Sequence, residues 1–144
     1  MPHAQPIFAP EKLRRYPHMF PLDISIWERF LEKVGSEYTG FDYDVKVGTG
    51  STPLENTPPE YARMQDILSK FRIDVVGYKP SQIEIMEVKP EASTVAIGQV
   101  LTYLELYKRD AQPTLPVIGV IITDHAIPDI DYLTKILGFD YYVV

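Results

Sequence analysis

A near-continuous apolar run at Val117–Thr123 constrains the fold of this chain more than any other feature of the sequence. A run of this kind, without alternation, is typical of a strand buried on both faces of a sheet, and such strands are often parallel. Parallel strands are joined by a crossover connection, which is usually a helix. The sequence therefore predicts an α/β protein in which helices alternate with at least part of the sheet.

The remaining segments show the periodicity of either helices or strands. Helical spacing predicts a first helix with Asp23 as its N-cap and Gly35 at its end, followed by helices over about 60–70, 94–109 and 130–137. Alternation predicts strands over 41–47, 71–78 and 83–89, and a last edge strand over 141–144. We therefore expect an antiparallel meander of three strands that continues into a parallel or mixed extension.

Composition excludes several classes of protein. The 14 basic and 20 acidic residues give a formal net charge of −6, which argues against a histone-like protein that binds through bulk positive charge. The absence of cysteine excludes disulfides, thiolate nucleophiles, Cys-ligated zinc and iron–sulfur clusters. Because we see neither a spanning apolar segment nor a signal-peptide pattern, we expect a soluble, cytoplasmic protein with no membrane partner.

The beginning of the chain is rich in proline, which disfavours regular helix and central strand. We interpret residues 1–22 as an arm and 23–144 as a single domain. The arm either lies pinned to the surface or frays. Alternatively, it docks a partner protein or touches a phosphate backbone.

Two carboxylates on neighbouring predicted strands carry the chemical signal. Glu87 and Lys89 extend the apolar face of the strand over 83–89, and Asp74 lies in the preceding strand. If the two strands pair, Asp74 and Glu87 converge, and two close carboxylates repel unless one is protonated or a cation lies between them. Oxygen ligands of this kind suit Mg²⁺ or Mn²⁺.

These residues resemble a known family. Ile73-Asp74, then Glu87-Val88-Lys89, then a helix with Gln99 and Tyr103, is similar to the PD-(D/E)XK nuclease superfamily, in its RecB-like and lambda-exonuclease-like branch with a QxxxY signature. The resemblance implies a restriction-endonuclease-like αβββαβ core with an additional C-terminal helix and strand. It also implies a Mg²⁺- or Mn²⁺-dependent deoxyribonuclease of phage or of DNA repair and recombination.

The resemblance implies a role for each matching residue. Asp74, Glu87 and the Val88 carbonyl would hold the metal, and Lys89 would orient the attacking water or stabilise developing charge. Gln99 and Tyr103 would position Lys89, the water or the phosphate, and Glu28 on the first helix is the candidate for an extra acidic metal ligand. A second match, Asp44-Val45-Lys46, precedes a turn rather than a helix, so we prefer Glu87-Val88-Lys89.

The DNA partner needs local positive charge, for which Arg72, Lys108 and Arg109 are candidates. The small size leaves selectivity to a homo-oligomer, a partner protein or a DNA end. The alternative is a catalytically idle protein of the same fold that serves as an assembly module in a nucleoprotein or viral complex, and is then virion-associated.

Overall fold

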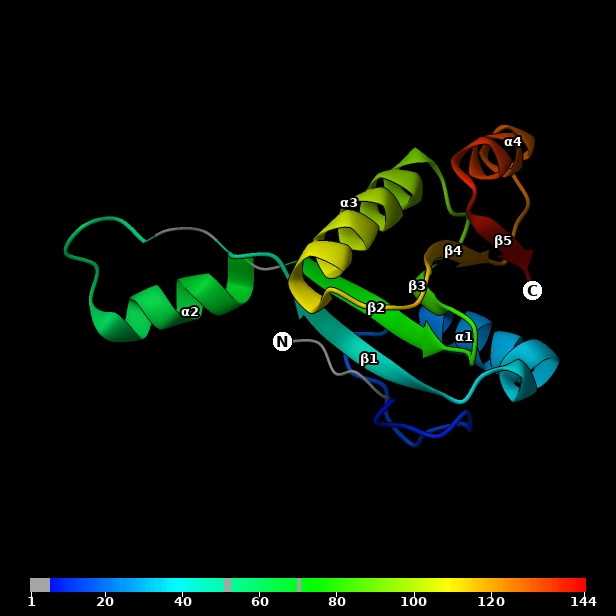
Figure 1. The fold of residues 1–144 in the computed structure, drawn as a ribbon, viewed down its shortest axis with the longest axis horizontal. Helices are drawn as coiled ribbons and strands as arrows, with labels where there is room; N and C mark the ends of the chain where they lie inside the picture. Colours follow the sequence, from blue (N-terminus) through cyan, green and yellow to red (C-terminus); the bar gives the residue numbers. More distant parts are fainter. Residues whose placement is uncertain (1–5, 51–52, 70) are drawn as a thin grey trace.

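A five-stranded mixed sheet forms the centre of the protein, shown in Figure 1 as a computed structural model that describes residues 6–50, 53–69 and 71–144. The elements run in the order α1 (Pro21–Val34), a 3₁₀ turn (Gly35–Glu37), β1 (Gly40–Val47), α2 (Pro59–Ser69), β2 (Phe71–Tyr78), β3 (Ile83–Val88), α3 (Thr94–Ala111), β4 (Val117–Thr123), α4 (Pro128–Leu137) and β5 (Asp140–Val143). The predicted mixed α/β fold class is confirmed.

The strands lie in sequence order, β1-β2-β3-β4-β5. β1 pairs antiparallel with β2 and β2 with β3, whereas β3 with β4 and β4 with β5 are parallel. The meander with a parallel extension is therefore confirmed. β3 is central and all six of its residues are buried, which places Glu84 and Glu87 in the interior.

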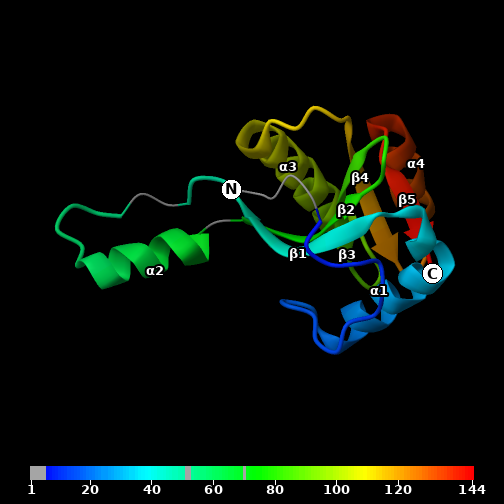
Figure 2. The same cartoon turned by 60° about the horizontal axis from the view of Figure 1, so that its bottom comes forward.

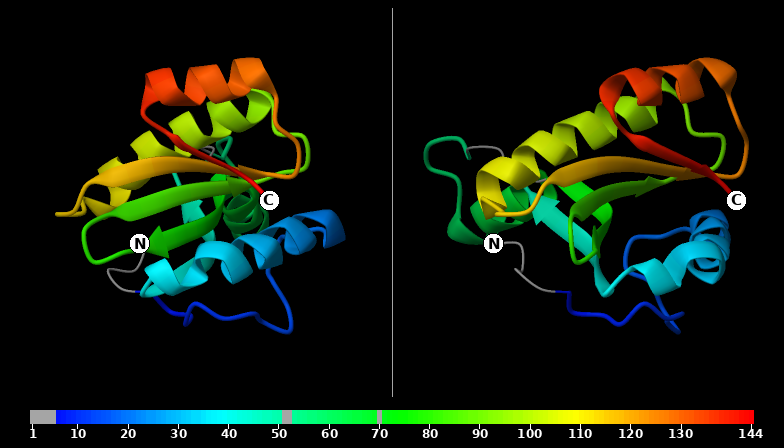
Figure 3. Two further views of the ribbon diagram at one scale, coloured as in Figure 1. Left: turned by 90° about the vertical axis from the view of Figure 1, so that its right-hand side faces the viewer. Right: turned by 45° about the vertical axis from the view of Figure 1, so that its right-hand side comes forward.

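Helices cover both faces of this sheet (Figure 3). α3 and α4 lie on one face and α1 lies on the other. Gly119 in β4 allows α3 to approach closely, because a side chain there would collide with Val100 of α3 and with Phe139. Two cores result, one between the sheet and α3 and one between the sheet and α1.

The start of α1 differs from the prediction. The N-cap is Phe20 rather than Asp23, and Pro21 takes the first helical position, where its missing N–H costs no hydrogen bond. Asp23 lies three residues after the cap, and its carboxylate accepts the Phe20 N–H at 3.1 Å. Asp23 thus stabilises the first turn from inside the helix.

The described part of the proline-rich arm is pinned to the domain. Phe8 forms an isolated antiparallel bridge with Phe41 of β1. The Ile7 N–H donates to the buried Asp42 carboxylate at 2.7 Å, and Tyr16 is buried against the α1 core. The boundary predicted at residue 22 therefore separates segments that pack together.

α2 projects from the end of the sheet where β1 ends and β2 begins, and both Figures 1 and 2 show it away from the other helices. α3 continues to Ala111, two residues beyond the prediction, and stops where Gln112 adopts a left-handed conformation. Among the helices of the described residues, none is long and apolar enough to cross a membrane.

Candidate active site at the end of β3

At the end of the β2–β3 ladder, the side chain of Asp74 takes the place of a backbone hydrogen-bond acceptor. The paired positions run from Tyr78–Ile83 to Val75–Met86. Beyond them, the Val88 N–H donates to the Asp74 carboxylate at 3.0 Å instead of to a β2 carbonyl. A buried backbone N–H needs such an acceptor. This hydrogen bond fixes the Asp74 side chain beside the last residues of β3.

β1 and β2 bend together at Asp44 and Asp74. Ile73 packs in the α3 core and Val75 in the α1 core, although residues two apart on a regular strand share one face. Opposite this point Asp44 has a φ of 52°, in the left-handed region that aspartate tolerates better than most residues. The local reversal of faces turns Asp74 towards β3.

Asp74, which is half-buried, and Glu87, which is buried, form a carboxylate pair. Burial raises the pKa of both groups, and the charge of Asp74 raises the pKa of Glu87 further. The Val88 N–H favours the ionised form of Asp74, which lowers the pKa of that carboxyl in part. The pair therefore holds a shared proton near neutral pH.

Two side-chain oxygens at the site are buried and lack a hydrogen-bond partner in the part of the chain that the structure describes. Within the described residues, neither Oε2 of Glu87 nor Oε1 of Gln99 has a hydrogen-bond partner, although both atoms are buried. A divalent cation would relieve the repulsion between the carboxylates and satisfy an oxygen of this kind. The described residues contain no group of three or more His, Asp or Glu arranged around a metal, so the candidate is a two-carboxylate site. The backbone of Val88 is next to this site, because its N–H donates to the Asp74 carboxylate.

Lys89 and Tyr103 interact electrostatically with the carboxylate pair, and Gln99 contacts Tyr103. The Lys89 ammonium lowers the pKa of both Asp74 and Glu87, which places its charge nearby. Burial raises the pKa of the Tyr103 hydroxyl, and the Glu87 charge adds to that rise. The Gln99 side-chain amide donates to the Tyr103 hydroxyl at 3.4 Å. The structure thus brings together all five residues for which the resemblance implied catalysis.

The acidic residue that α1 contributes is not the one expected. Glu28 raises the pKa of Lys12 and of Tyr16, so it faces the N-terminal arm. Asp23 instead raises the pKa of both members of the carboxylate pair. The structure therefore does not support Glu28 as a metal ligand. The sequence analysis missed Asp23 because it interpreted this residue as the N-cap of the first helix. Nothing in the sequence indicates that the start of this helix lies near the carboxylate pair.

The residues predicted to bind DNA lie beside carboxylates. Arg72 Nε is 3.4 Å from Asp44 Oδ1, in a geometry that is an ion pair rather than a hydrogen bond. Arg109 Nε donates to Asp110 at 2.8 Å. Lys108 Nζ is 3.4 Å from Glu105. Lys108 and Arg109 are near the C-terminus of α3, and Lys108 is roughly 14 Å along the helix from Gln99.

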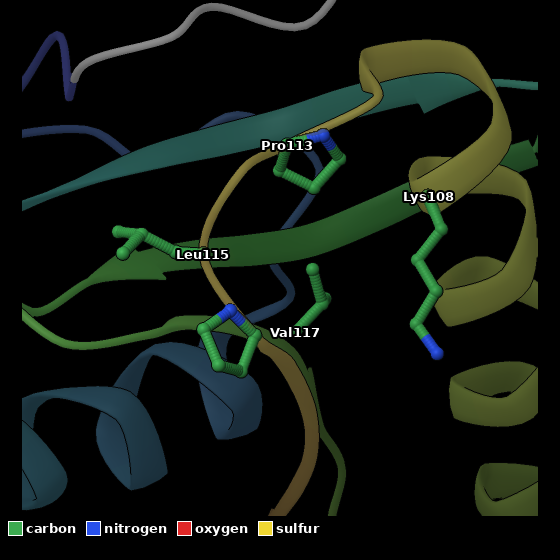
Figure 4. Close-up of a pocket in the computed structure, with 5 residues that line it drawn as sticks. Lys108, Pro113, Leu115 and Val117 are labelled. Carbon is green, nitrogen blue, oxygen red and sulfur yellow. The ribbon is translucent and has the colours of Figure 1, made fainter.

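Lys108 also lines a hollow of about 440 Å³. Figure 4 shows its side chain extending from α3 beside the segment that leads into β4. The other lining residues are apolar: Pro113, Leu115, Pro116 and Val117. This hollow is separate from the carboxylate pair, because it lies at the opposite end of α3 and at the start of β4.

Comparisons with protein-family models, curated proteins and solved structures find no match for this chain. The geometry of the site is therefore the basis for a functional proposal. It defines a mixed α/β protein with an acidic pair, formed by Asp74 of β2 and the buried Glu87 of β3, close to a lysine, a glutamine and a tyrosine.

Proposed function

We propose that this protein is a metal-dependent deoxyribonuclease that hydrolyses phosphodiester bonds at the Asp74–Glu87 pair. One observation carries the proposal. The half-buried Asp74 and the buried Glu87 converge, and within the described residues a buried oxygen of Glu87 has no hydrogen-bond partner. A structural role favours satisfied groups at such positions, so this arrangement supports a function that requires a cation.

Asp74, Glu87 and the backbone carbonyl of Val88 are the groups that would hold Mg²⁺ or Mn²⁺. When bound, the ion polarises the phosphate and lowers the pKa of a water nucleophile. Asp74 is held ready for this role by the Val88 N–H. The pair would lose its shared proton on binding the ion.

Lys89 and Gln99 act on the reacting atoms in this proposal. The Lys89 ammonium orients the attacking water by hydrogen bonding or stabilises negative charge as it develops on the phosphate. The buried Oε1 of Gln99 can accept a hydrogen bond from Lys89 or from that water. Tyr103 fixes the amide of Gln99 through its hydroxyl.

An idle assembly module of the same fold remains the second candidate, and one observation favours it. Arg72, Lys108 and Arg109 all lie beside carboxylates, which weakens their attraction for phosphate. Such a module needs neither metal binding nor the carboxylate pair.

The decisive experiment measures cleavage of labelled linear duplex, circular duplex and single-stranded DNA with Mg²⁺ or Mn²⁺ and with EDTA. The chain offers a matched control, because Lys46 stands in the second Asp-x-Lys match and is exposed. We expect Lys89→Ala to abolish metal-dependent cleavage and Lys46→Ala to retain it. Metal-independent cleavage, or equal loss in both variants, would contradict the proposal.

Metal binding without cleavage is measured on the same proteins. We expect Mn²⁺ to raise the Tm of the wild type, because an ion that binds only the folded state at about 100 times its Kd adds about 2.7 kcal/mol of stability. Asp74→Asn should remove this rise. A wild type that neither cleaves DNA nor gains stability from Mn²⁺ would favour the assembly module.

A further inference from the structure

Phe71 presents an aromatic ring to solvent next to the carboxylate site. It is the first residue of β2 and is 50% exposed. Its ring centroid is 6.1 Å from that of Tyr103, in a tilted arrangement. Because the Tyr103 hydroxyl contacts Gln99 at 3.4 Å and Phe71 lies on the same strand as Asp74, Phe71 lies at the border of the proposed active site.

The ring is held in place on its protein side. Phe71 Cδ2 and Leu106 Cδ1 both lie 3.6 Å from the position that a β-carbon on Gly48 would occupy. Gly48 has a φ of 90°, which disfavours a larger residue at this position. One side of the ring therefore packs beside Gly48, Leu106 and Tyr103, while half of the side chain stays open.

Electrostatic attraction for a DNA duplex is weak in this region. Arg72, which follows Phe71 directly, lies beside Asp44, and the formal net charge of the chain is −6. Duplex binding depends mainly on cations that neutralise phosphates. Affinity for nucleic acid must therefore come in large part from another interaction, and stacking of a base on an aromatic ring is one that needs no net charge.

Resting on the proposed function, we infer that the substrate is single-stranded or unpaired DNA, with a base stacked on Phe71 beside the bond to be cleaved. Paired bases in a duplex have their faces covered by neighbouring bases, whereas an unpaired nucleotide offers a free face. Phe71 precedes Asp74 by three residues, roughly 10 Å along an extended strand. This spacing leaves the adjoining phosphate within reach of the carboxylate pair.

Binding is measured with Ca²⁺ in place of Mg²⁺, so that the result does not depend on turnover. The probes are a short labelled oligothymidylate and a duplex of the same length. Phe71→Leu keeps an apolar side chain beside Gly48 and removes the aromatic face, whereas Phe71→Trp restores an aromatic face. Tyr132→Ala is the control, because Tyr132 is an exposed aromatic residue on α4, away from the site.

We expect the wild type to bind the single strand more tightly than the duplex. Phe71→Leu should weaken single-strand binding by ~5- to ~100-fold and leave duplex binding unchanged. Phe71→Trp and Tyr132→Ala should bind like the wild type. Equal single-strand binding by Phe71→Leu and the wild type, or a preference of the wild type for duplex, would overturn the inference.

The proposed function is judged separately by cleavage. Metal-dependent cleavage that Lys89→Ala abolishes would stand even if Phe71→Leu changed nothing. Conversely, loss of single-strand binding in Phe71→Leu would be seen in Ca²⁺ even if no substrate were cleaved.

Discussion

Glu84 and Glu87 lie three residues apart on β3 and are both buried, but their hydrogen bonding is opposite in kind. Glu84 accepts hydrogen bonds from the Tyr38 hydroxyl at 2.7 Å and from the Gln82 amide at 2.9 Å, and it pairs with Lys79 Nζ at 3.0 Å. Among the described residues, Oε2 of Glu87 has no hydrogen-bond partner. β3 therefore carries one buried carboxylate, Glu84, with a full set of hydrogen bonds. The hydrogen bonding of the other, Glu87, is incomplete within the part of the chain that the structure describes, which argues against a purely structural role for it.

Substitution by glutamine should separate these two carboxylates. Glu84→Gln leaves Lys79 beside a neutral group and should reduce the free energy of unfolding by about 2–4 kcal/mol. Glu87→Gln is neutral and removes the need to keep a proton on the pair near neutral pH, so it should leave stability unchanged or raise it by about 0.5–2 kcal/mol. Urea unfolding in EDTA measures both effects. A larger loss in Glu87→Gln than in Glu84→Gln would show that Glu87 is a structural residue.

Stability of the metal-free protein should fall as the pH rises. The pKa of Glu87 is raised in the folded state by burial and by Asp74, above its ordinary value of 4.5. Above about pH 4.5 the unfolded chain therefore releases a proton that the folded protein still holds, and stability declines until the folded pair also loses it. The Tm of Glu87→Gln relative to wild type should thus increase between about pH 5 and pH 8. A constant difference across that range would mean that the pair holds no shared proton.

Asp23 and Glu28 offer a matched test of the acidic contribution from α1. Asp23→Asn removes a charge that acts on both carboxylates and should weaken Mn²⁺ binding by about 2- to 10-fold. The asparagine oxygen can still accept the Phe20 N–H, so the first turn of α1 is retained. Glu28→Gln should leave Mn²⁺ affinity unchanged, because Glu28 faces Lys12 and Tyr16. Calorimetric titration with Mn²⁺ measures both affinities. If Glu28 were the ligand, Glu28→Gln would bind Mn²⁺ more weakly than Asp23→Asn.

Gln99 should matter for cleavage and not for stability. Gln99→Leu replaces a side chain whose buried Oε1 has no partner among the described residues, so the change in unfolding free energy should stay within about 1 kcal/mol. Cleavage should fall by about 10- to 100-fold through loss of positioning.

Gln82→Leu is the counterpart of this variant. Gln82 donates to Glu84, so its loss should cost about 1 kcal/mol of stability and leave cleavage unchanged. Single-turnover cleavage rates and urea unfolding should be measured for both variants. An unaltered cleavage rate in Gln99→Leu would show that Gln99 has no role in cleavage.

The alternation of apolar residues was sufficient to predict which strands meet. The uninterrupted run at Val117–Thr123 became a strand paired in parallel with β3, and the facing positions of Asp74 and Glu87 followed from the hairpin over 71–88. The bend at Asp44 and Asp74 was not predictable, because it depends on two strands that deviate together. The ion pair of Arg72 with Asp44 was missed for the same reason, since it forms across β1 and β2. The restriction-endonuclease-like core stays a prediction.

The bridge between Phe8 and Phe41 also affects how a variant without the N-terminal arm would behave. It pairs the N–H and C=O of Phe41 on the outer edge of β1, groups that would otherwise be available for pairing with another molecule. Deleting the arm would therefore promote self-association, and a loss of activity in that protein would reveal nothing about substrate binding. A side chain at Gly40 would collide with the Phe8 carbonyl and with Pro6, so Gly40→Val would displace the arm without removing any of its residues. This variant would expose the same edge of β1, so self-association shared by both proteins would be assigned to the edge and not to the lost residues.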